Sequence, residues 1–327
     1  MKLVVTVLEE TCEAAVRAIR GIGLPHDMVE VRAERFPSLD CEALQAATAK
    51  PVILTFRNAP RRDVPEWRGL IDVEWREGIT IADPARTVLS HHDYDGMADV
   101  EAIMAKMRAL GCAYTKLAAT PRTFADNERL LQLLLPTANC QLPTTVIGMG
   151  ERGLYSRILA PFRGSELAFV AATNLAAPGQ LTLDRAHEIY GVPKAEKVFA
   201  VAGNPAGHSL SPVIHNRLFR EKNVPAAYTI ASIERFDEIT GAFLRGEPCG
   251  LSVTTPFKED AFAFAPDPAP NARRARAVNT LVNVNGRILA DNTDVDGFAM
   301  LIGAPAAGRP VHRPLAGDPR RAAGGPA

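Results

Sequence analysis

Residues 144–171 read TTVIGMGERGLYSRILAPFRGSELAFVA and contain two patterns in turn. TTVIG (144–148) and LAFVA (167–171) are short runs of β-branched and apolar residues, which are typical of buried strands. The stretch between them, Arg152–Ala160, has the apolar spacing of a helix. A strand, a helix and a second strand in this order predict one βαβ unit with parallel strands.

The same alternation recurs from residue 3 to residue 171. Helical stretches are expected at Glu9–Ile22, Met97–Leu110 and Arg122–Leu135. Near-continuous apolar strands that alternate with helices predict a buried parallel sheet, and eight such units predict an α/β fold, a closed (β/α)8 barrel. The eight strand candidates are LVVTV (3–7), MVEVR (28–32), VILTF (52–56), LIDVE (70–74), RTVLS (86–90), YTKLA (114–118), TTVIG (144–148) and LAFVA (167–171).

Two connections of this barrel are short. Only 13 residues separate the third strand from the fourth, and only 11 separate the fourth from the fifth. A crossover between parallel strands needs about a dozen residues including its helix. The helices after strands three and four are therefore predicted to be trimmed to a turn or two.

A second α/β pattern follows the barrel. Residues 181–194 predict a closing helix, and a new strand, a Gly/Pro/Ser loop and a helix over Val213–Lys222 come next. AAYTIAS (226–232) and CGLSVTT (249–255) are further strands, and residues 281–291 form a hairpin with an Asn-Gly turn. We therefore expect a barrel over 1–194, an α/β domain over 195–301 and a disordered tail over 302–327, where apolar periodicity ends.

Composition narrows the class of protein. The chain has 327 residues, of which 47% are hydrophobic and 23% charged, and its formal net charge is zero. A balanced charge argues against nucleic acid and anionic membranes as partners, and no apolar run is long enough to span a bilayer. The five cysteines form no CxxC pair, and no metal-ligand spacing occurs. These features predict a cytoplasmic protein with reduced thiols and no metal.

Barrel chemistry is expected at the carboxyl ends of the strands. Lys116 lies inside an apolar strand, and a buried amine that loses its proton can attack a carbonyl. His91 and His92 follow the neighbouring strand and can move protons near neutral pH. Each signal has an ordinary structural alternative, such as a snorkelling lysine or an ion-pair layer. Their shared position favours a site, to which the same rim adds Glu30, Arg32, Arg57, Glu74, Met149, Arg157 and Gln180.

These residues sit in motifs that resemble type I 3-dehydroquinate dehydratase over about residues 1–190: VEVRAERF, TFRNA, IDVEW, LSHHDYDG, YTKLA, GLYSRIL and AAPGQLT. The resemblance implies a Schiff base between Lys116 and the ketone of 3-dehydroquinate, with no cofactor. It implies that His92 removes the C2 proton and then protonates the departing hydroxyl. The substrate-binding residues it implies are Glu30, Arg32, Arg57, Arg157 and Gln180, and Thr6 stands at a usual serine position.

The barrel also departs from the pattern of that family. In that family an acidic residue usually follows the TFR motif and supports the histidine. Here TFR is followed by NAPRRD, with Arg61 near that position. Ala176 stands where a serine often precedes APGQ. The family barrel commonly pairs through surface helices, so a homodimer is possible.

The second domain carries NPAGHSLSPVIHN, SVTTPFK, AVNTL and DNTD. Hydroxyls and free N–H groups at a helix start suit a carboxylate, although Ser-Pro and NTD are also ordinary helix-start and turn signals. In this order the motifs resemble the substrate-binding domain of shikimate dehydrogenase. The resemblance implies a catalytic pair, Lys258 and Asp294, with shikimate or 3-dehydroshikimate held by Ser209, Ser211, Thr254, Asn279 and Asp294. Ser252 replaces a usual asparagine and Arg276 a usual glycine.

The leading hypothesis is a bifunctional shikimate-pathway enzyme that stops before its NADP-binding domain. Barrel and second domain follow in the order of fused enzymes of this pathway, where the first product is the second substrate. We expect dehydratase activity, and we expect the dehydrogenase half to bind its ligand without a nicotinamide site, through a frameshift or as a pseudoenzyme. Two alternatives remain: a metabolite-binding protein or sensor for the same ligands, and a class I aldolase-type lyase, which gives no reason for HHDY and APGQ.

Overall fold

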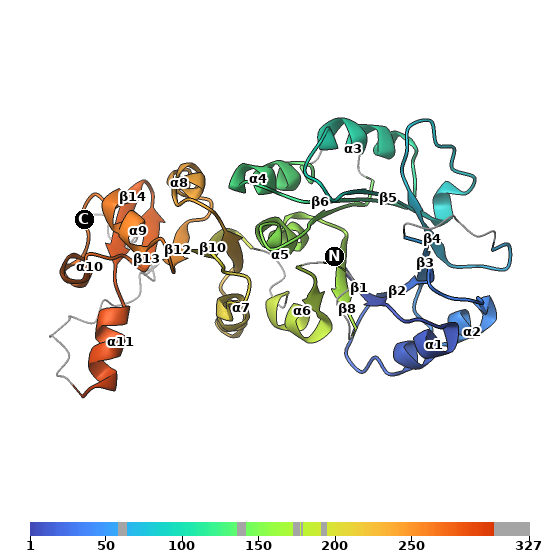
Figure 1. The fold of residues 1–327 in the computed structure, drawn as a ribbon, viewed down its shortest axis with the longest axis horizontal. Helices are drawn as coiled ribbons and strands as arrows, with labels where there is room; N and C mark the ends of the chain where they lie inside the picture. Colours follow the sequence, from blue (N-terminus) through green and yellow to red (C-terminus); the bar gives the residue numbers. More distant parts are fainter. Residues whose placement is uncertain (58–63, 136–141, 173–176, 178, 191–194, 304–327) are drawn as a thin grey trace, which may run out of the picture.

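The computed structural model describes residues 1–57, 64–135, 142–172, 177, 179–190 and 195–303. Its elements fall into two sheets with their covering helices, and Figure 1 shows these two parts side by side along the longest axis. Arg61, Cys140, Ala176 and the tail beyond Gly303 lie outside the described residues. The expected domain limits, including the boundary at 194/195, stay a prediction.

The first sheet is parallel throughout, and its strands follow the order β7-β6-β5-β4-β3-β2-β1-β8-β9. Seven of the eight predicted strands agree with the observed bounds to within one residue at each end, and four of these match at both ends, because buried β-branched runs bounded by turns are a strong local signal. The strands are β1 (Lys2–Val7), β2 (Met28–Arg32), β3 (Val52–Thr55), β4 (Leu70–Glu74), β5 (Thr87–Asp93), β6 (Tyr114–Ala119), β7 (Thr144–Gly148), β8 (Leu167–Ala171) and β9 (Leu181–Thr182).

The sheet curls as a barrel does, but its ladder is open between β7 and β8. Three hydrogen bonds among the described residues join that seam: Glu166 N donates to Thr144 O at 2.8 Å, Leu167 N to Thr145 Oγ1 at 3.0 Å and Val146 N to Ser165 Oγ at 3.3 Å. On its other side β8 pairs with β1 in parallel, with Val5 opposite Val170. The predicted α/β fold is confirmed, with the barrel seam held by single bonds in place of a full strand ladder.

Helices cover the outside of this sheet where the connections are long enough. They are α1 (Cys12–Arg20), α2 (Cys41–Ala46), α3 (Val100–Ala109), α4 (Phe124–Gln132), α5 (Leu154–Leu159) and α6 (Leu183–Ile189), with a 3-10 turn η2 (Ala160–Arg163) after α5. Within the described residues between β3 and β5, the only helix is the 3-10 turn η1 (Pro84–Arg86). Trp67 packs there instead, fully buried in the apolar cluster under β2 and β3, and its Nε1 donates to Leu70 O at 2.9 Å.

The second sheet has the strand order β11-β10-β12-β13-β14, and its last two strands run antiparallel to their neighbours. The Asn285-Gly286 turn joins β13 to β14 with positive φ at both residues, as predicted for a tight hairpin. The elements are β10 (Lys197–Gly203), α7 (Ser211–Glu221), β11 (Ala226–Ser232), α8 (Asp237–Leu244), β12 (Gly250–Val253), α9 (Lys258–Phe264), α10 (Pro270–Ala275), β13 (Thr280–Val284), β14 (Arg287–Asp291) and α11 (Asp294–Leu301).

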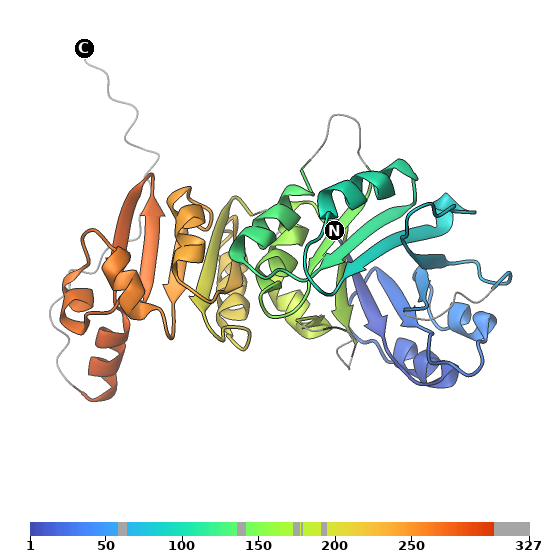
Figure 2. The ribbon, with the colours of Figure 1, turned by 45° about the horizontal axis from the view of Figure 1, so that its top comes forward.

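α5 joins the two parts. Every residue of this helix is buried, which one apolar stripe against one sheet would not produce. Tyr155 and Leu159 belong to the apolar cluster of the second sheet, while Leu154 and Ile158 pack with side chains of β1 and β8. Thr229 Oγ1 of β11 donates to Tyr155 O at 3.2 Å. Figure 1 shows α5 between the two sheets, and Figure 2 shows the same arrangement turned by 45°.

A carboxylate before α5 also crosses this interface. Glu151 accepts hydrogen bonds from Ala206 N and Gly207 N, both at 2.9 Å, and from Ser232 Oγ at 3.1 Å. The bonds from Gly207 and Ala206 hold the pKa of Glu151 below its ordinary value. The barrel thereby fixes the loop of the second part that leads into α7.

Replacing this carboxylate should loosen the loop. In Glu151→Ala, we expect the amide protons of Ala206 and Gly207 to exchange with solvent about 5- to 10-fold faster, since each lost bond contributes roughly 1 kcal/mol. Hydrogen exchange followed by NMR measures this. Glu221→Ala on α7, which removes only the exposed pair with Arg217, is the matched control. Equal exchange in Glu151→Ala and the control would contradict the role of Glu151.

Candidate active site

A cavity of about 290 Å³ opens at the carboxyl ends of the barrel strands. Such an edge collects side chains from every strand of a parallel barrel, so residues far apart in sequence meet there. All the barrel residues to which the family resemblance gave a role line this cavity: Glu30, Arg32, Arg57, His92, Lys116, Arg157 and Gln180, together with Thr6 and Met149. His91 and Glu74, also expected at the rim, are not among its lining residues.

Lys116 lies at the floor of the cavity on β6, with its side chain only 3% exposed. Its Nζ donates to Asp72 Oδ2 at 2.8 Å and lies 3.7 Å from Glu30 Oε1. The same atom lies 4.2 Å from the centroid of the Phe169 ring, which favours a cation electrostatically. Two carboxylates and one ring face therefore fix the position of the amine.

Asp72 is a site residue that the sequence analysis missed. It also accepts from Arg57 Nη2 at 3.1 Å and from Ser90 Oγ at 2.6 Å. Its complete burial raises the pKa, but Lys116 and Arg57 outweigh burial and hold the pKa of Asp72 well below its ordinary value. The signal was present in LIDVE, because alternation along a strand puts Asp72 and Glu74 on one face.

Glu30 is the second carboxylate beside the lysine. Thr6 Oγ1 donates to its Oε2 at 2.8 Å and Thr55 Oγ1 to its Oε1 at 3.0 Å. Burial raises its pKa, yet the charge of Lys116 brings the net pKa of Glu30 below the ordinary value. Both carboxylates beside Lys116 are therefore charged at neutral pH.

His92 lies on the wall of the cavity at the end of β5. Its Nδ1 is 2.8 Å from Glu74 Oε2, and its backbone N donates to Glu74 Oε1 at 2.8 Å. Arg57 Nη1 pairs with the same carboxylate and is 2.8 Å from Nδ1. A Nδ1–H that donates to Glu74 leaves Nε2 as the nitrogen able to take a proton. Glu74, which the sequence analysis placed at the rim without a stated role, supports the histidine.

The electrostatics keep His92 neutral. Burial of the ring lowers the pKa of His92, and Glu74 opposes this effect, while the charges of Lys116 and Arg57 lower the pKa further. The net direction is below the ordinary value, so the neutral imidazole predominates at pH 7. A neutral ring is the form that can act as a general base.

The remaining predicted residues surround the mouth of the cavity. Arg157 Nε on α5 donates to Gly148 O at 2.7 Å, and burial lowers the pKa of Arg157 to about 10. Arg32 Nη2 lies 2.5 Å from Glu34 Oε1, and its buried Nε has no hydrogen-bond partner among the described residues. Gln180 Nε2 donates to Thr6 Oγ1 at 3.3 Å. Donors at this mouth suit an anionic ligand.

A second cavity, of about 470 Å³, lies at the carboxyl ends of β10 and β12. It is lined by all the residues predicted for the second site: Ser209, Ser211, Thr254, Lys258, Asn279 and Asp294. Lys258 Nζ donates to Asp294 Oδ2 at 2.7 Å. Asn279 Nδ2 donates to Thr293 Oγ1 at 3.0 Å, which connects β13 to the start of α11. Lysine and carboxylate thus form a half-exposed pair that can exchange a proton with a ligand.

Two departures of the second domain now have structural accounts. Ser252 Oγ accepts from Tyr228 OH at 2.7 Å, so this shorter side chain is hydrogen-bonded inside the sheet. Arg276 ends α10 with φ of 51°, in the left-handed region that favours glycine. This conformation explains why a glycine is usual at that position.

Other expectations concern metals, membranes and thiols. Among the described residues, no group of three or more His, Cys, Asp or Glu side chains could hold a metal ion. No helix in the described part of the chain is long and apolar enough to cross a bilayer. Cys12, Cys41, Cys112 and Cys249 are free thiols.

Comparison with known protein families separates the two parts. Residues 69–197 match the model of type I 3-dehydroquinase, and residues 201–281 match that of the shikimate dehydrogenase substrate binding domain. The class is thus a type I dehydroquinase barrel joined to a shikimate dehydrogenase substrate-binding domain, which confirms the predicted resemblance.

Individual relatives agree with this class. The bifunctional 3-dehydroquinate dehydratase/shikimate dehydrogenase of Arabidopsis thaliana is 30% identical over 246 residues, which cover 72% of this chain and 40% of that protein. The shikimate biosynthesis protein AroDE of Chlamydia pneumoniae is 27% identical over 320 residues, covering 89% and 65%. A crystal structure of 3-dehydroquinate dehydratase from Geobacillus kaustophilus shares the fold, with 24% identity, a TM-score of 0.50 and coverage of 56% and 87%. The chain therefore spans 40% of the plant relative and 65% of the chlamydial one.

The protonation of His92 gives a direct test of this site. We expect its imidazole to titrate below the ordinary histidine pKa of about 6.5, and to titrate lower still in Glu74→Gln, because the opposing carboxylate charge is lost. NMR of the ring protons across pH 4–8 measures both values. Glu77→Gln, which removes an exposed partner of Lys106, is the control. A higher pKa in Glu74→Gln than in the unmodified protein would refute the assigned contact.

Proposed function

We propose that the barrel dehydrates 3-dehydroquinate to 3-dehydroshikimate through a Schiff base on Lys116. The observation that carries this proposal is one buried cavity with a lysine fixed between Asp72 and Glu30 and a neutral histidine on its wall. A cyclic β-hydroxy ketone needs both groups, because its C2 proton is too weakly acidic for imidazole until the ketone becomes an iminium.

The steps conserve atoms and charge. Lys116 releases one ammonium proton to water and its free amine attacks the ketone; the carbinolamine takes up one proton as its hydroxyl leaves as water, which gives the iminium. His92 Nε2 takes the C2 proton, and the electron pair flows to the iminium nitrogen. The protonated ring returns this proton to the C1 hydroxyl, which leaves as water. Hydrolysis releases the enone and restores the amine.

The mouth of the cavity supports binding of an acid. Arg32, Arg57 and Arg157 bring three guanidinium groups to one cavity, and the Arg32 Nε lacks a partner among the described residues. Arg57 is already paired with Asp72 and Glu74, so it positions the carboxylates of the site. We assign the substrate carboxylate to Arg32 and Arg157, and the ring hydroxyls to Glu30 and Gln180.

We further propose that the second cavity binds 3-dehydroshikimate or shikimate. Ser209 and Ser211 lie beside the start of α7, and Lys258 and Asp294 form a pair able to hand one proton to a ring oxygen. The names of shikimate dehydrogenase relatives specify NADP. In the described residues no strand follows α11, so nothing there fits the strand, glycine-rich turn and helix that hold this cofactor.

Trapping tests the barrel chemistry. Sodium borohydride with 3-dehydroquinate should reduce the iminium and add the ligand covalently to the intact protein, and mass spectrometry of peptides should locate it on Lys116. Lys116→Ala should lose the adduct and reduce dehydration by at least about 10³-fold, since the covalent route is gone. Lys106→Ala on the exposed face of α3 is the control. An adduct of equal yield in Lys116→Ala would refute the assignment.

Calorimetry tests the second cavity. Shikimate should bind the protein, and Asn279→Ala should weaken this binding about tenfold, because one or two hydrogen bonds to the ligand are lost. Asn285→Gly, in the tight hairpin turn where positive φ suits glycine, should leave the affinity unchanged. Shikimate binding without any dehydration of 3-dehydroquinate would favour the metabolite-binding alternative over the enzyme.

A further inference from the structure

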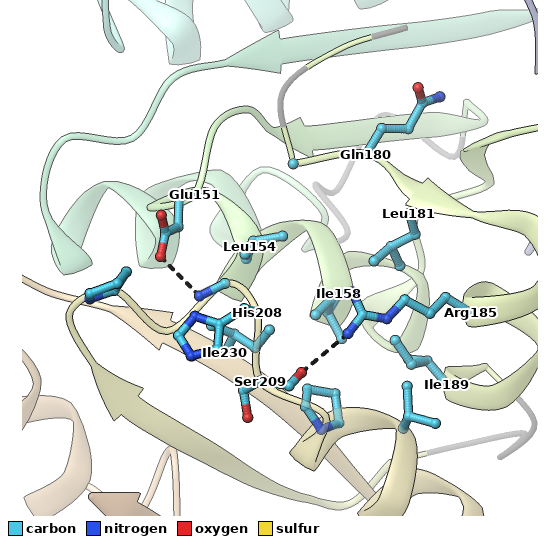
Figure 3. A pocket seen from close by; sticks show the side chains of 15 residues that line it. Glu151, Leu154, Ile158, Gln180, Leu181, Arg185, Ile189, His208, Ser209 and Ile230 are labelled. Carbon is cyan, nitrogen blue, oxygen red and sulfur yellow. Dashed lines mark hydrogen bonds between the residues drawn. The ribbon is translucent and has the colours of Figure 1, made fainter. Parts of the chain in front are cut away.

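A third cavity, of about 450 Å³, lies between the barrel and the second domain (Figure 3). Its barrel side comes from the loop before α5, α5 itself and the segment from Gly179 through α6. Its other side comes from the loop between β10 and α7, with Ile230 of β11. Neither the proposed dehydration nor the proposed shikimate binding takes place in this cavity.

The cavity borders both candidate sites. Gln180 lines it together with the barrel cavity, and Pro205, His208 and Ser209 line it together with the second cavity. Figure 3 shows the Gln180 side chain pointing away from His208 and Ser209, in agreement with its bond to Thr6 inside the barrel. Gln180 therefore belongs to the walls of both the barrel cavity and the cavity between the domains.

The chemistry of the walls suits a small acid with an apolar ring face. Leu154, Ile158 and Leu181 give one apolar surface. Arg185 reaches across the cavity, where its Nη2 donates to Ser209 O at 3.3 Å, and Figure 3 shows this contact. Among the described residues this carbonyl is the one hydrogen-bond partner of the Arg185 side chain, which leaves most of its five guanidinium N–H donors to an anion.

Glu151 is the one carboxylate among the described residues of these walls, and it is already hydrogen-bonded. Glu151 accepts from Ala206 N, Gly207 N and Ser232 Oγ, so its charge is spread over three donors. The same bonds fix the loop that carries His208 and Ser209. The wall of the cavity nearest the second site is thus held in place by the barrel.

We propose that this cavity is a binding site for a monoanionic cyclic hydroxy acid, the product of the barrel reaction, with its carboxylate on Arg185. The site lies between the place where that product forms and the place where the second domain would bind it. This inference rests on the proposed function of the barrel, and it assigns the product a third site distinct from both cavities described above.

The test isolates the third site by occupying or weakening the other two. In the Asn279→Ala protein, borohydride with 3-dehydroquinate first fills the barrel with a covalent adduct. Titration calorimetry with 3-dehydroshikimate should then show about one further molar equivalent of binding. Adding Arg185→Met should weaken that binding about tenfold, and Arg185→Lys should restore part of it, because a charge-assisted hydrogen bond is lost and partly regained.

Controls separate this inference from the function of the barrel. Arg217→Met on the exposed face of α7, which removes only the pair with Glu221, should bind 3-dehydroshikimate as the parent does. Arg185→Met should keep the rate of dehydration, since Arg185 does not line the barrel cavity. Failure to form the adduct would overturn the barrel function and this inference with it. Adduct formation with no further binding, or with binding unaffected by Arg185→Met, would overturn this inference alone.

Discussion

The burial of α5 on all its faces is the constraint on which the rest of the structure depends. One face packs with β1 and β8 of the barrel, and the other belongs to the core of the second sheet. Because the helix is shared, removing either sheet would expose apolar side chains of the other part. The same helix carries Arg157 into the barrel cavity, and Glu151 precedes it at the loop of the second domain. Packing of one short helix therefore positions residues of both sites.

Inside the barrel, the pairing of opposite charges positions the residues of the site. Lys116 and Arg57 are buried beside Asp72, Glu30 and Glu74, and each carboxylate has further hydrogen-bond donors. Burying Lys116, Arg57, Asp72 or Glu30 alone would be strongly unfavourable, so these four charges stabilise one another as a network, with the partly exposed Glu74 at its edge. The network also sets the chemistry, since it keeps Asp72 and Glu30 ionised and His92 neutral. Stability and reactivity at this site have the same physical origin.

Which features the sequence predicted depends on how far apart the interacting residues lie along the chain. Strand patterns are local, so TTVIG and LAFVA matched β7 and β8 at both ends. The family motifs located Lys116 and His92, which line one cavity. Asp72 escaped notice because its partner is 44 residues away. Glu74 was expected at the rim, but its pairing with His92, 18 residues further on, was not foreseen. The open seam between β7 and β8 was also unpredictable, since closure depends on the register of the whole barrel.

The sequence by itself determined the elements, their parallel arrangement and the families of the two parts, because these depend on local periodicity and on motifs of fixed spacing. Only the tertiary structure decided which carboxylate faces Lys116, which one supports His92, and that a cavity with Arg185 on its wall lies between the two sites. These outcomes depend on how two sheets pack around α5, and that packing is a sum of many long-range contacts that no single segment encodes.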